Sequence, residues 1–276
     1  MLARARAAVT IVTILVTVFI ANVARADLIL GAPPRESTAA GDKVYGMLAD
    51  YLSKATGQKV VYEHPANWGL YQALMTLGHY DLVFDGPHFV DWRDQHLKHV
   101  PLVALNGSLS FVVIVRADNS TMHSMDDLAG HSVCAHDPPN LATLTLLDRF
   151  PNPAQQPRLV EIEGFQAAFK GLMGKKCTAT VLPDAVYAKL DGDHHLTRVL
   201  YQSADMPNQA LTAGPKVSAQ ARASIIQAMT NPDSQNIATQ IARSLGGKYF
   251  KPATADQYKG YMALLRNVWG FGVASQ

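Results

Sequence analysis

The chain has 276 residues, enough for one large domain or two modest ones, with no low-complexity tract and no repeat at solenoid periods. Lys and Arg total 24 against 22 Asp and Glu, but three of the arginines lie in the first 26 residues. The rest of the chain is therefore close to neutral, which argues against a nucleic-acid-binding protein, because such proteins present a basic surface.

The first 26 residues are predicted to be a signal peptide. Arg4 and Arg6 precede an apolar run over residues 7–21, and Ala24-Arg25-Ala26 offers a small-x-small cleavage site. We expect export to the periplasm and removal of this segment. The alternative is an apolar run that remains as an uncleaved membrane anchor. No later stretch of sequence is long enough to span a bilayer.

The first half of the mature chain alternates short apolar strands with amphipathic helices. Strands are predicted over 27–31, 60–62, 81–84 and 101–104, and helices over 42–56, 70–77 and from His88 onward. This order is typical of a parallel sheet covered by helices. Because ligands collect at the carboxyl ends of such strands, the loops 63–68 and 85–89 are predicted to form half of a binding cleft.

The second half repeats this pattern. The β-branched run 107–117 is predicted to cross into a second lobe, with strands at 130–135, 158–162 and 177–181 and helices at 141–150, 166–173 and 185–190. Residues 211–213 would return to the first lobe, and helices over 219–229, 234–245 and 254–268 would follow. We therefore predict an α/β fold of two lobes, each a mainly parallel sheet flanked by helices, with the ligand cleft between them. Residues 27–112 and 210–276 would form lobe I, and 113–209 lobe II.

Cys134 and Cys177 are the only cysteines. In a three-stranded parallel block the first strand commonly lies between the second and third, which would bring these two residues side by side. Neighbouring strands are about 4.8 Å apart, and a disulfide needs Cα atoms roughly 5.5–6 Å apart. We predict a disulfide, in keeping with export to an oxidising compartment. Two buried free thiols are the alternative.

Several segments occur in an order and at spacings that carry a family resemblance. They are Pro34-Arg35, the helix residues 47–52 with 53–57, the strand 81–84 with Gly86-Pro87, the crossing strand 111–116, and residues 126–130. Together they resemble the phosphate/phosphonate-type periplasmic solute-binding proteins of ABC importers, over nearly all of the mature chain. The resemblance implies a type 2 periplasmic-binding fold in which two lobes close on a ligand. It also implies a pocket lined by Asn67-Trp68, by Gly86-Pro87 and by the loop after Ala135.

The loop over residues 136–143 departs from the family pattern. Relatives that bind phosphate-like anions are rich in Ser, Thr and Gly there, which supplies hydrogen-bond donors at a helix N-terminus. Here two prolines remove N–H donors and Asp137 adds a negative charge, so that Asn140, Thr143 and the first helical amides remain as donors. Asp85 replaces the apolar residue usual before Gly86-Pro87. A doubly charged phosphonate would therefore meet two carboxylates.

The strand-end loops supply the candidate ligand-binding residues. His88 and His136 follow strands of different lobes; as imidazolium donors they would hold an anion, and as neutral imidazoles beside a carboxylate they would bind a transition metal. Trp68 could stack on a ligand, and Arg35 could pair with an anionic group. For each the alternative is an ordinary structural role. The full set is Arg35, Trp68, Tyr71, Asp85, His88, His136, Asp137, Asn140, Thr143, Asp184 and Tyr187.

The sequence contains no G-x-S-x-G, H-E-x-x-H, Walker or Rossmann motif, so neither a catalytic residue nor a cofactor is predicted. The function favoured is that of a monomeric periplasmic solute-binding protein. It would capture a small polar, anionic ligand, phosphonate- or phosphate-like, by hinge closure and present it to an ABC permease or a sensor kinase. The alternative is a metal- or redox-linked periplasmic protein that uses the cleft histidines.

Overall fold

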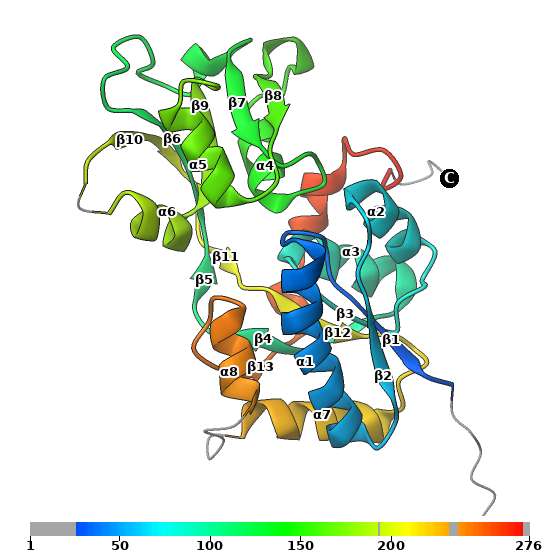
Figure 1. Cartoon of the computed structure of the whole chain (residues 1–276). Helices are drawn as coiled ribbons and strands as arrows, with labels where there is room; N and C mark the ends of the chain where they lie inside the picture. The colour runs from blue at the N-terminus through cyan, green and yellow to red at the C-terminus, as the bar shows by residue number, and fades with distance from the viewer. Residues whose placement is uncertain (1–25, 193, 232–236, 273–276) are drawn as a thin grey trace, which may run out of the picture.

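The computed structural model describes residues 26–192, 194–231 and 237–272, so the predicted signal peptide lies outside the described residues except for Ala26. It contains two large sheets in separate halves of the molecule (Figure 1). We call the half with the six-stranded sheet lobe I and the half with the five-stranded sheet lobe II. This arrangement confirms the predicted α/β fold of two lobes. No helix among the described residues is both long and apolar enough to cross a bilayer.

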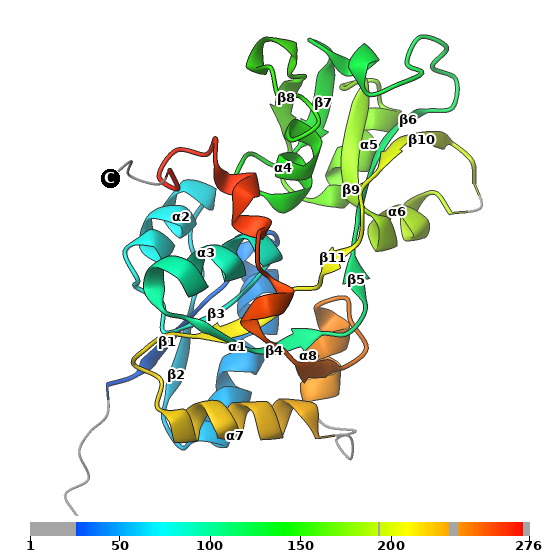
Figure 2. The same cartoon turned by 180° about the vertical axis from the view of Figure 1, so that it is seen from behind.

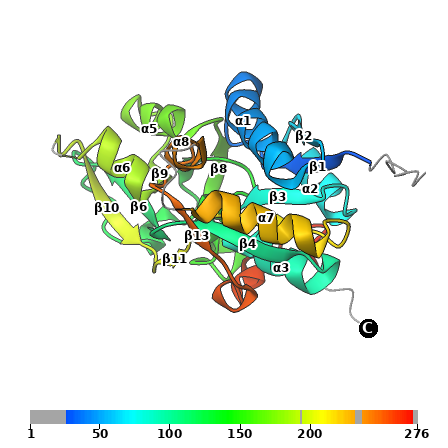
Figure 3. The same cartoon turned by 90° about the horizontal axis from the view of Figure 1, so that it is seen from below.

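The sheet of lobe I has the strand order β13-β4-β12-β3-β1-β2. Its strands are β1 (Leu28–Gly31), β2 (Val60–Glu63), β3 (Leu82–Asp85), β4 (Val100–Leu105), β12 (Ala210–Ala213) and β13 (Phe250–Pro252). Helices α1 (Thr38–Thr56), α7 (Ala219–Thr230) and α8 (Ile237–Ser244) cover one face, and α2 (Trp68–Thr76) and α3 (Pro87–Leu97) cover the other. Figure 3 shows α7 lying across β4.

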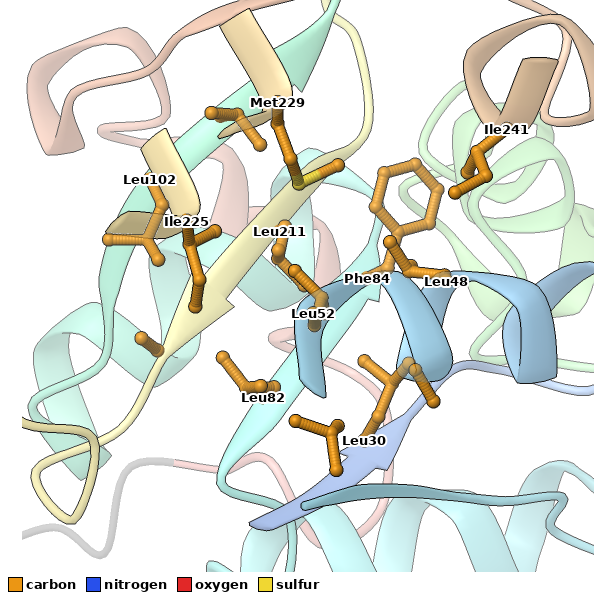
Figure 4. Packing of buried hydrophobic residues seen from close by; sticks show 14 of the residues in the cluster. Leu30, Leu48, Leu52, Leu82, Phe84, Leu102, Leu211, Ile225, Met229 and Ile241 are labelled. Carbon is orange, nitrogen blue, oxygen red and sulfur yellow. The ribbon is translucent and has the colours of Figure 1, made fainter. Parts of the chain in front are cut away.

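Alternation along β3 decides which side chains meet which helices. Leu82 and Phe84 face the core built with α1 and α7, which Figure 4 shows from close by, whereas Val83 faces α2 and α3. Successive side chains of a strand point to opposite faces. Asp85, the next residue, therefore belongs to the α2 and α3 side, and this position matters for the site below.

The sheet of lobe II has the order β10-β6-β9-β7-β8. Its strands are β6 (Phe111–Arg116), β7 (Ser132–Ala135), β8 (Arg158–Glu161), β9 (Ala179–Pro183) and β10 (Thr197–Gln202). Helix α4 (Leu141–Leu147) covers one face, and α5 (Phe165–Met173) and α6 (Asp184–Leu190) cover the other. As predicted, β7 lies between β8 and β9, and the Cys134–Cys177 disulfide is confirmed, with Cα atoms 5.6 Å apart.

Three predictions of secondary structure need correction. The sheets are mixed rather than mainly parallel. Parallel pairing joins only β2, β1 and β3 in lobe I, and β8, β7 and β9 in lobe II. The strands that cross between the lobes pair antiparallel with their neighbours. Strands β10, β11 (Met206–Pro207) and β13 were not predicted. The helix predicted over 254–268 is instead a pair of 3₁₀ helices, η3 (Ala255–Gln257) and η4 (Tyr261–Leu265). Gly260, with φ +95°, interrupts any continuous helix between them.

A two-stranded ribbon links the lobes. Strand β5 (Ser108–Leu109) leaves lobe I and pairs antiparallel with β11 (Met206–Pro207), which leads back to β12. The predicted return strand 211–213 is therefore part of the lobe I sheet, and the crossing itself lies a few residues earlier. The C-terminal segment also contacts both lobes, since η4 packs against α3 and α4 (Figure 2) and Arg266 pairs with Asp148 of lobe II at 2.6 Å.

Candidate ligand-binding site

A pocket lies between the lobes, with about 420 Å³ of space free of protein atoms. We call it the inner pocket. Lobe I contributes Pro33, Arg35, Trp68, Gly86, His88 and Phe89; lobe II contributes Phe111, Asn140, Leu141, Ala142, Phe165 and Pro183; and the linking ribbon contributes Leu109 and Gln209. Its lining is mostly apolar with a few polar groups, as is common for small-molecule sites. A ligand held there would touch both lobes.

A wider groove opens beside the inner pocket, with about 1720 Å³ of free space. We call it the outer groove. It shares Arg35 and Trp68 with the inner pocket and adds His64, His136, Asp137 and several acidic side chains. Arg35 and Trp68 of lobe I therefore border both spaces, which we treat together as the candidate site.

Local sequence rules position these side chains. Asn67 caps α2, where its Oδ1 accepts a hydrogen bond of 2.8 Å from the backbone N–H of Leu70, and this cap puts Trp68 at the first helical position. Gly86 caps α3 before Pro87, a favoured first helical residue. A Cβ on Gly86 would lie 3.1 Å from the His88 ring and 3.3 Å from Leu141 of lobe II. The glycine thus permits the close approach of the two lobes.

Arg35 is the positively charged residue of the site. Of the described residues that line either space, it is the only arginine or lysine. Burial acts to lower the pKa of Arg35, but Tyr45 and Glu36 outweigh burial and hold this pKa above its ordinary value. Its Nη2 donates to the Tyr45 hydroxyl at 3.3 Å. The guanidinium stays charged beside the pocket, and its buried Nε has no hydrogen-bond partner among the described residues, so it retains a donor for an anionic group.

The two cleft histidines are neutral near pH 7. Burial lowers the pKa of both His88 and His136 to about 4. Nε2 of His88 lies 3.1 Å from the Pro139 carbonyl oxygen, to which it donates across the pocket from lobe I to lobe II. The His136 ring packs near Trp68 and edge-on to Phe165, at centroid distances of 6.1 and 5.1 Å. Burial therefore disfavours the predicted arrangement in which two charged imidazolium groups hold an anion.

The metal alternative finds no support in the described part of the chain. Among residues 26–192, 194–231 and 237–272, no three His, Cys, Asp or Glu side chains are grouped so that they could hold a metal ion. Both cysteines form the disulfide, so neither supplies a free thiol.

Two predicted ligand contacts, Asp85 and Tyr71, lie beneath the inner pocket and do not line it. Asp85 is fully buried, and its two carboxylate oxygens pair with Nη1 and Nη2 of Arg93 at 2.5 and 2.7 Å. The Tyr71 hydroxyl donates to the same carboxylate, and Arg93 also donates to Thr212 at 3.1 Å. The expected ligand role of these residues is corrected to a structural one, because their polar atoms already have partners inside lobe I.

Other predicted residues also use their polar groups in hydrogen bonds within the protein. The Thr143 hydroxyl donates to the His136 carbonyl oxygen at 2.5 Å, and Asn140 Oδ1 accepts from the Ala142 amide at 3.0 Å while Asn140 still lines the inner pocket. Asp184 begins α6 and Tyr187 packs with the α5 and α6 side of lobe II; neither lines the inner pocket or the outer groove. Of the predicted set, Arg35, Trp68, His88, His136, Asp137 and Asn140 come together at the site.

Sequence reasoning missed several lining residues. Glu161 is the last residue of β8, and Glu163 and Phe165 follow it, so the strand-end rule that selected His136 would have selected them too. Phe89 lies one residue after His88, on the first turn of α3. Phe111 and Gln209 belong to the crossing between lobes, where no local pattern marks a pocket.

A family model described as the periplasmic substrate-binding protein of a phosphonate ABC transporter matches residues 30–258. No curated protein matches the chain. Among solved structures, it is similar to PhnD1 of Prochlorococcus marinus in complex with methylphosphonate, at 15% identity over 87% of this chain and 97% of that one, with a TM-score of 0.70.

Two further solved structures share the fold. A binding-protein component of an ABC phosphonate transporter from Pseudomonas aeruginosa is 12% identical over 84% of this chain and 83% of that one, with a TM-score of 0.67. A Xanthomonas citri protein bound to ATP is 12% identical over 87% and 96%, with a TM-score of 0.69. The structural likeness establishes a type 2 periplasmic-binding fold. Because the family model covers most of the chain, this protein belongs to the family of periplasmic substrate-binding proteins of phosphonate ABC transporters.

Proposed function

We propose that this protein captures a small ligand with an anionic group between its lobes and delivers it to an ABC importer. The observation that carries the proposal is Arg35, the one Lys or Arg among the described lining residues, which borders a pocket built from both lobes. Guanidinium donors suit carboxylate and phosphonate oxygens. The ligand of this chain is thus an organic anion, and a phosphonate such as the methylphosphonate of the Prochlorococcus relative is the first compound to test.

Binding would work by closure of the lobes. A ligand that contacts both lobes stabilises the closed form by its preference for that form over the open one. His88 of lobe I already reaches Pro139 of lobe II, and Gly86 already lies close to Leu141, so closure requires little further movement of these parts. The ribbon of β5 and β11 is the natural hinge, because it is the narrowest connection.

We also propose the cellular setting and the lobe boundaries. Residues 1–26 serve as the export signal, and the protein works as a monomer in the periplasm, with a permease or a sensor as its partner. The described residues of 27–110 and 210–272 form lobe I, and those of 111–209 form lobe II. The boundary lies two residues before the expected 112/113, because β6 begins at Phe111 within the lobe II sheet. The family binds its substrate without chemical change, so turnover is not expected.

The test is calorimetry with the Arg35→Met variant, which keeps an unbranched side chain about as long as the arginine stem and removes the charged guanidinium. With methylphosphonate, phosphate and pentanoate as probes, we expect the variant to bind at least tenfold more weakly than the parent, a loss of about 1.4 kcal/mol. Arg243→Met is the matched control, because Arg243 is exposed on α8, which contributes nothing to the site. Equal affinities for the parent and the Arg35 variant would refute the role of Arg35.

A further inference from the structure

A late segment of the chain lies between the two lobes. Residues 258–271, which we call the C-terminal strap, follow β13 of lobe I and contact both α3 of lobe I and α4 of lobe II (Figure 1 and Figure 2). The ribbon of β5 and β11 links the lobes through the chain itself, whereas the strap reaches lobe II through side chains. The strap is therefore a second link, and one that can open.

The strap is anchored on lobe I. The Met262 amide donates to the Asp91 carboxylate of α3 at 2.8 Å. Leu265 and Phe271 are buried, with exposed fractions of 1% and 4%, in the apolar cluster that α2 and α3 form. The Phe271 ring lies edge-on to Trp92 of α3, with the ring centroids 5.3 Å apart. Because its buried residues belong to this cluster, the strap stays with lobe I when the lobes separate.

The contacts of the strap with lobe II are more exposed. Nη2 of Arg266 pairs with Oδ1 of Asp148 at 2.6 Å, and the two side chains are 54% and 40% exposed. Tyr261 and Leu264, both half-buried, pack against the apolar cluster of lobe II. A groove with about 1460 Å³ of free space, lined by the strap and by lobe II, lies beside these contacts. An interface of this kind opens without exposing a large apolar area to water.

Helix α4 connects this interface to the ligand site. Asn140 and Leu141, at its N-terminal end, line the inner pocket, and Asp148 is its C-terminal cap. Seven helical residues rise only about 10 Å, so one short element carries the pocket wall at one end and the partner of Arg266 at the other. The closure that brings Leu141 against Gly86 thus also brings Asp148 against the strap. Neither Arg266 nor Asp148 lines the inner pocket or the outer groove.

We propose that the C-terminal strap is a latch for the closed form. Arg266 and Leu264 hold α4 when the lobes are closed and release it when they part, so they set the affinity for the ligand without contacting it. A contact present only in the closed form raises the closed population, and the apparent affinity rises with that population. An exposed ion pair changes such an equilibrium about two- to fivefold. This inference rests on the proposed closure of the lobes, and not on the identity of the ligand.

The first experiment measures the distance between the lobes without ligand. Spin labels on Lys43→Cys of α1 and Lys170→Cys of α5, both exposed positions, report the open and closed forms by pulsed electron spin resonance, and the native disulfide leaves no other free thiol. We expect part of the parent population at the closed distance, and a closed-to-open ratio about two- to fivefold lower in Arg266→Gln. The charge reversal Arg266→Asp should lower the ratio further, and the exchanged pair Arg266→Asp/Asp148→Arg should restore it.

Arg243→Gln is the matched control, because Arg243 is exposed on α8, which packs against α1 and α7 of lobe I. It should leave the closed-to-open ratio unchanged. Calorimetry with methylphosphonate then compares the same variants, and the Kd should rise as the closed population falls. Melting temperatures should stay close to that of the parent, since the pair is exposed. A purely structural role of Arg266 would instead lower the melting temperature without changing the ratio.

The outcomes separate the latch from the proposed function. The latch is wrong if the ligand-free parent shows the open distance alone, or if Arg266→Asp keeps the closed-to-open ratio of the parent. An exchanged pair that does not restore the ratio overturns the assignment of the effect to Arg266 and Asp148. If the distances change as expected but methylphosphonate does not bind the folded parent, the latch stands and the choice of a phosphonate ligand is wrong.

Discussion

The buried pair of Asp85 and Arg93 allows a test of whether a strand-end carboxylate serves the ligand or the fold. Both side chains are fully buried, and they pair through two hydrogen bonds, with further donors from Tyr71 to Asp85 and from Arg93 to Thr212. Asp85→Asn keeps the size of the side chain and an acceptor oxygen for Tyr71. It removes the negative charge and leaves the guanidinium of Arg93 buried without compensation.

The expected loss of stability is large. Breaking a buried ion pair by removal of one partner costs about 3–5 kcal/mol, because the remaining charge stays in a medium of low polarity. For a protein of this size each kcal/mol shifts the melting temperature by about 2–4 °C, so Asp85→Asn should melt roughly 6–20 °C below the parent. The double variant Asp85→Leu/Arg93→Met, which removes both charges, should lose less than the single variant.

Urea unfolding and thermal unfolding measure these changes, with exposed Asp50→Asn as the control variant. At a temperature where Asp85→Asn is still folded, its affinity for the ligand should stay within about twofold of the parent, because Asp85 lies outside the pocket lining. A variant that loses under about 1 kcal/mol of stability but binds tenfold more weakly would refute this reasoning and restore Asp85 as a ligand contact.

The disulfide and the buried histidines give further predictions. The Cys134–Cys177 bridge closes a loop with a sequence separation of 43, so reduction should lower the free energy of unfolding by roughly 4 kcal/mol; an unchanged melting temperature in dithiothreitol would contradict this. His88 and His136 have pKa values near 4 in the folded state against about 6.5 unfolded, so the unfolded state binds more protons between these values. Stability should therefore be complete above pH 6.5 and fall by roughly 3 kcal/mol per histidine toward pH 4. Urea midpoints across this pH range for the parent and His88→Gln test it, since the variant should show a shallower slope.

The order of elements could be predicted because its signals are local. Gly57 ends α1 with φ +67°, Asn67 caps α2 and Pro87 begins α3, and each of these effects depends only on neighbouring residues. The helix predicted through Gly260 failed for the opposite reason, because its apolar spacing suited a helix while the backbone at that glycine did not. β10 was missed because it is a partly exposed edge strand without a clear apolar run.

The candidate site was only half predictable. The strand-end rule found Arg35, Trp68 and His136, because in a parallel block every carboxyl end reaches the same edge. It also selected Asp85, which its place in β3 turns toward α2 and toward Arg93. The strand-end rule does not predict on which face of the sheet a side chain lies or which residue it pairs with there.

The sequence by itself predicted a two-lobed α/β binding protein with a disulfide between neighbouring strands, and the structure confirms both features. Those features follow from apolar periodicity, turn residues and cysteine placement, which are written along the chain. Tertiary structure alone decided which charges are free to meet a ligand. Arg93 of α3 neutralises Asp85 inside lobe I, while Asp137 and Glu161 lie close to each other at the outer groove and, among the described residues, form no salt bridge. Pairing in space sets the net charge of a site, and the linear order of residues does not contain that pairing.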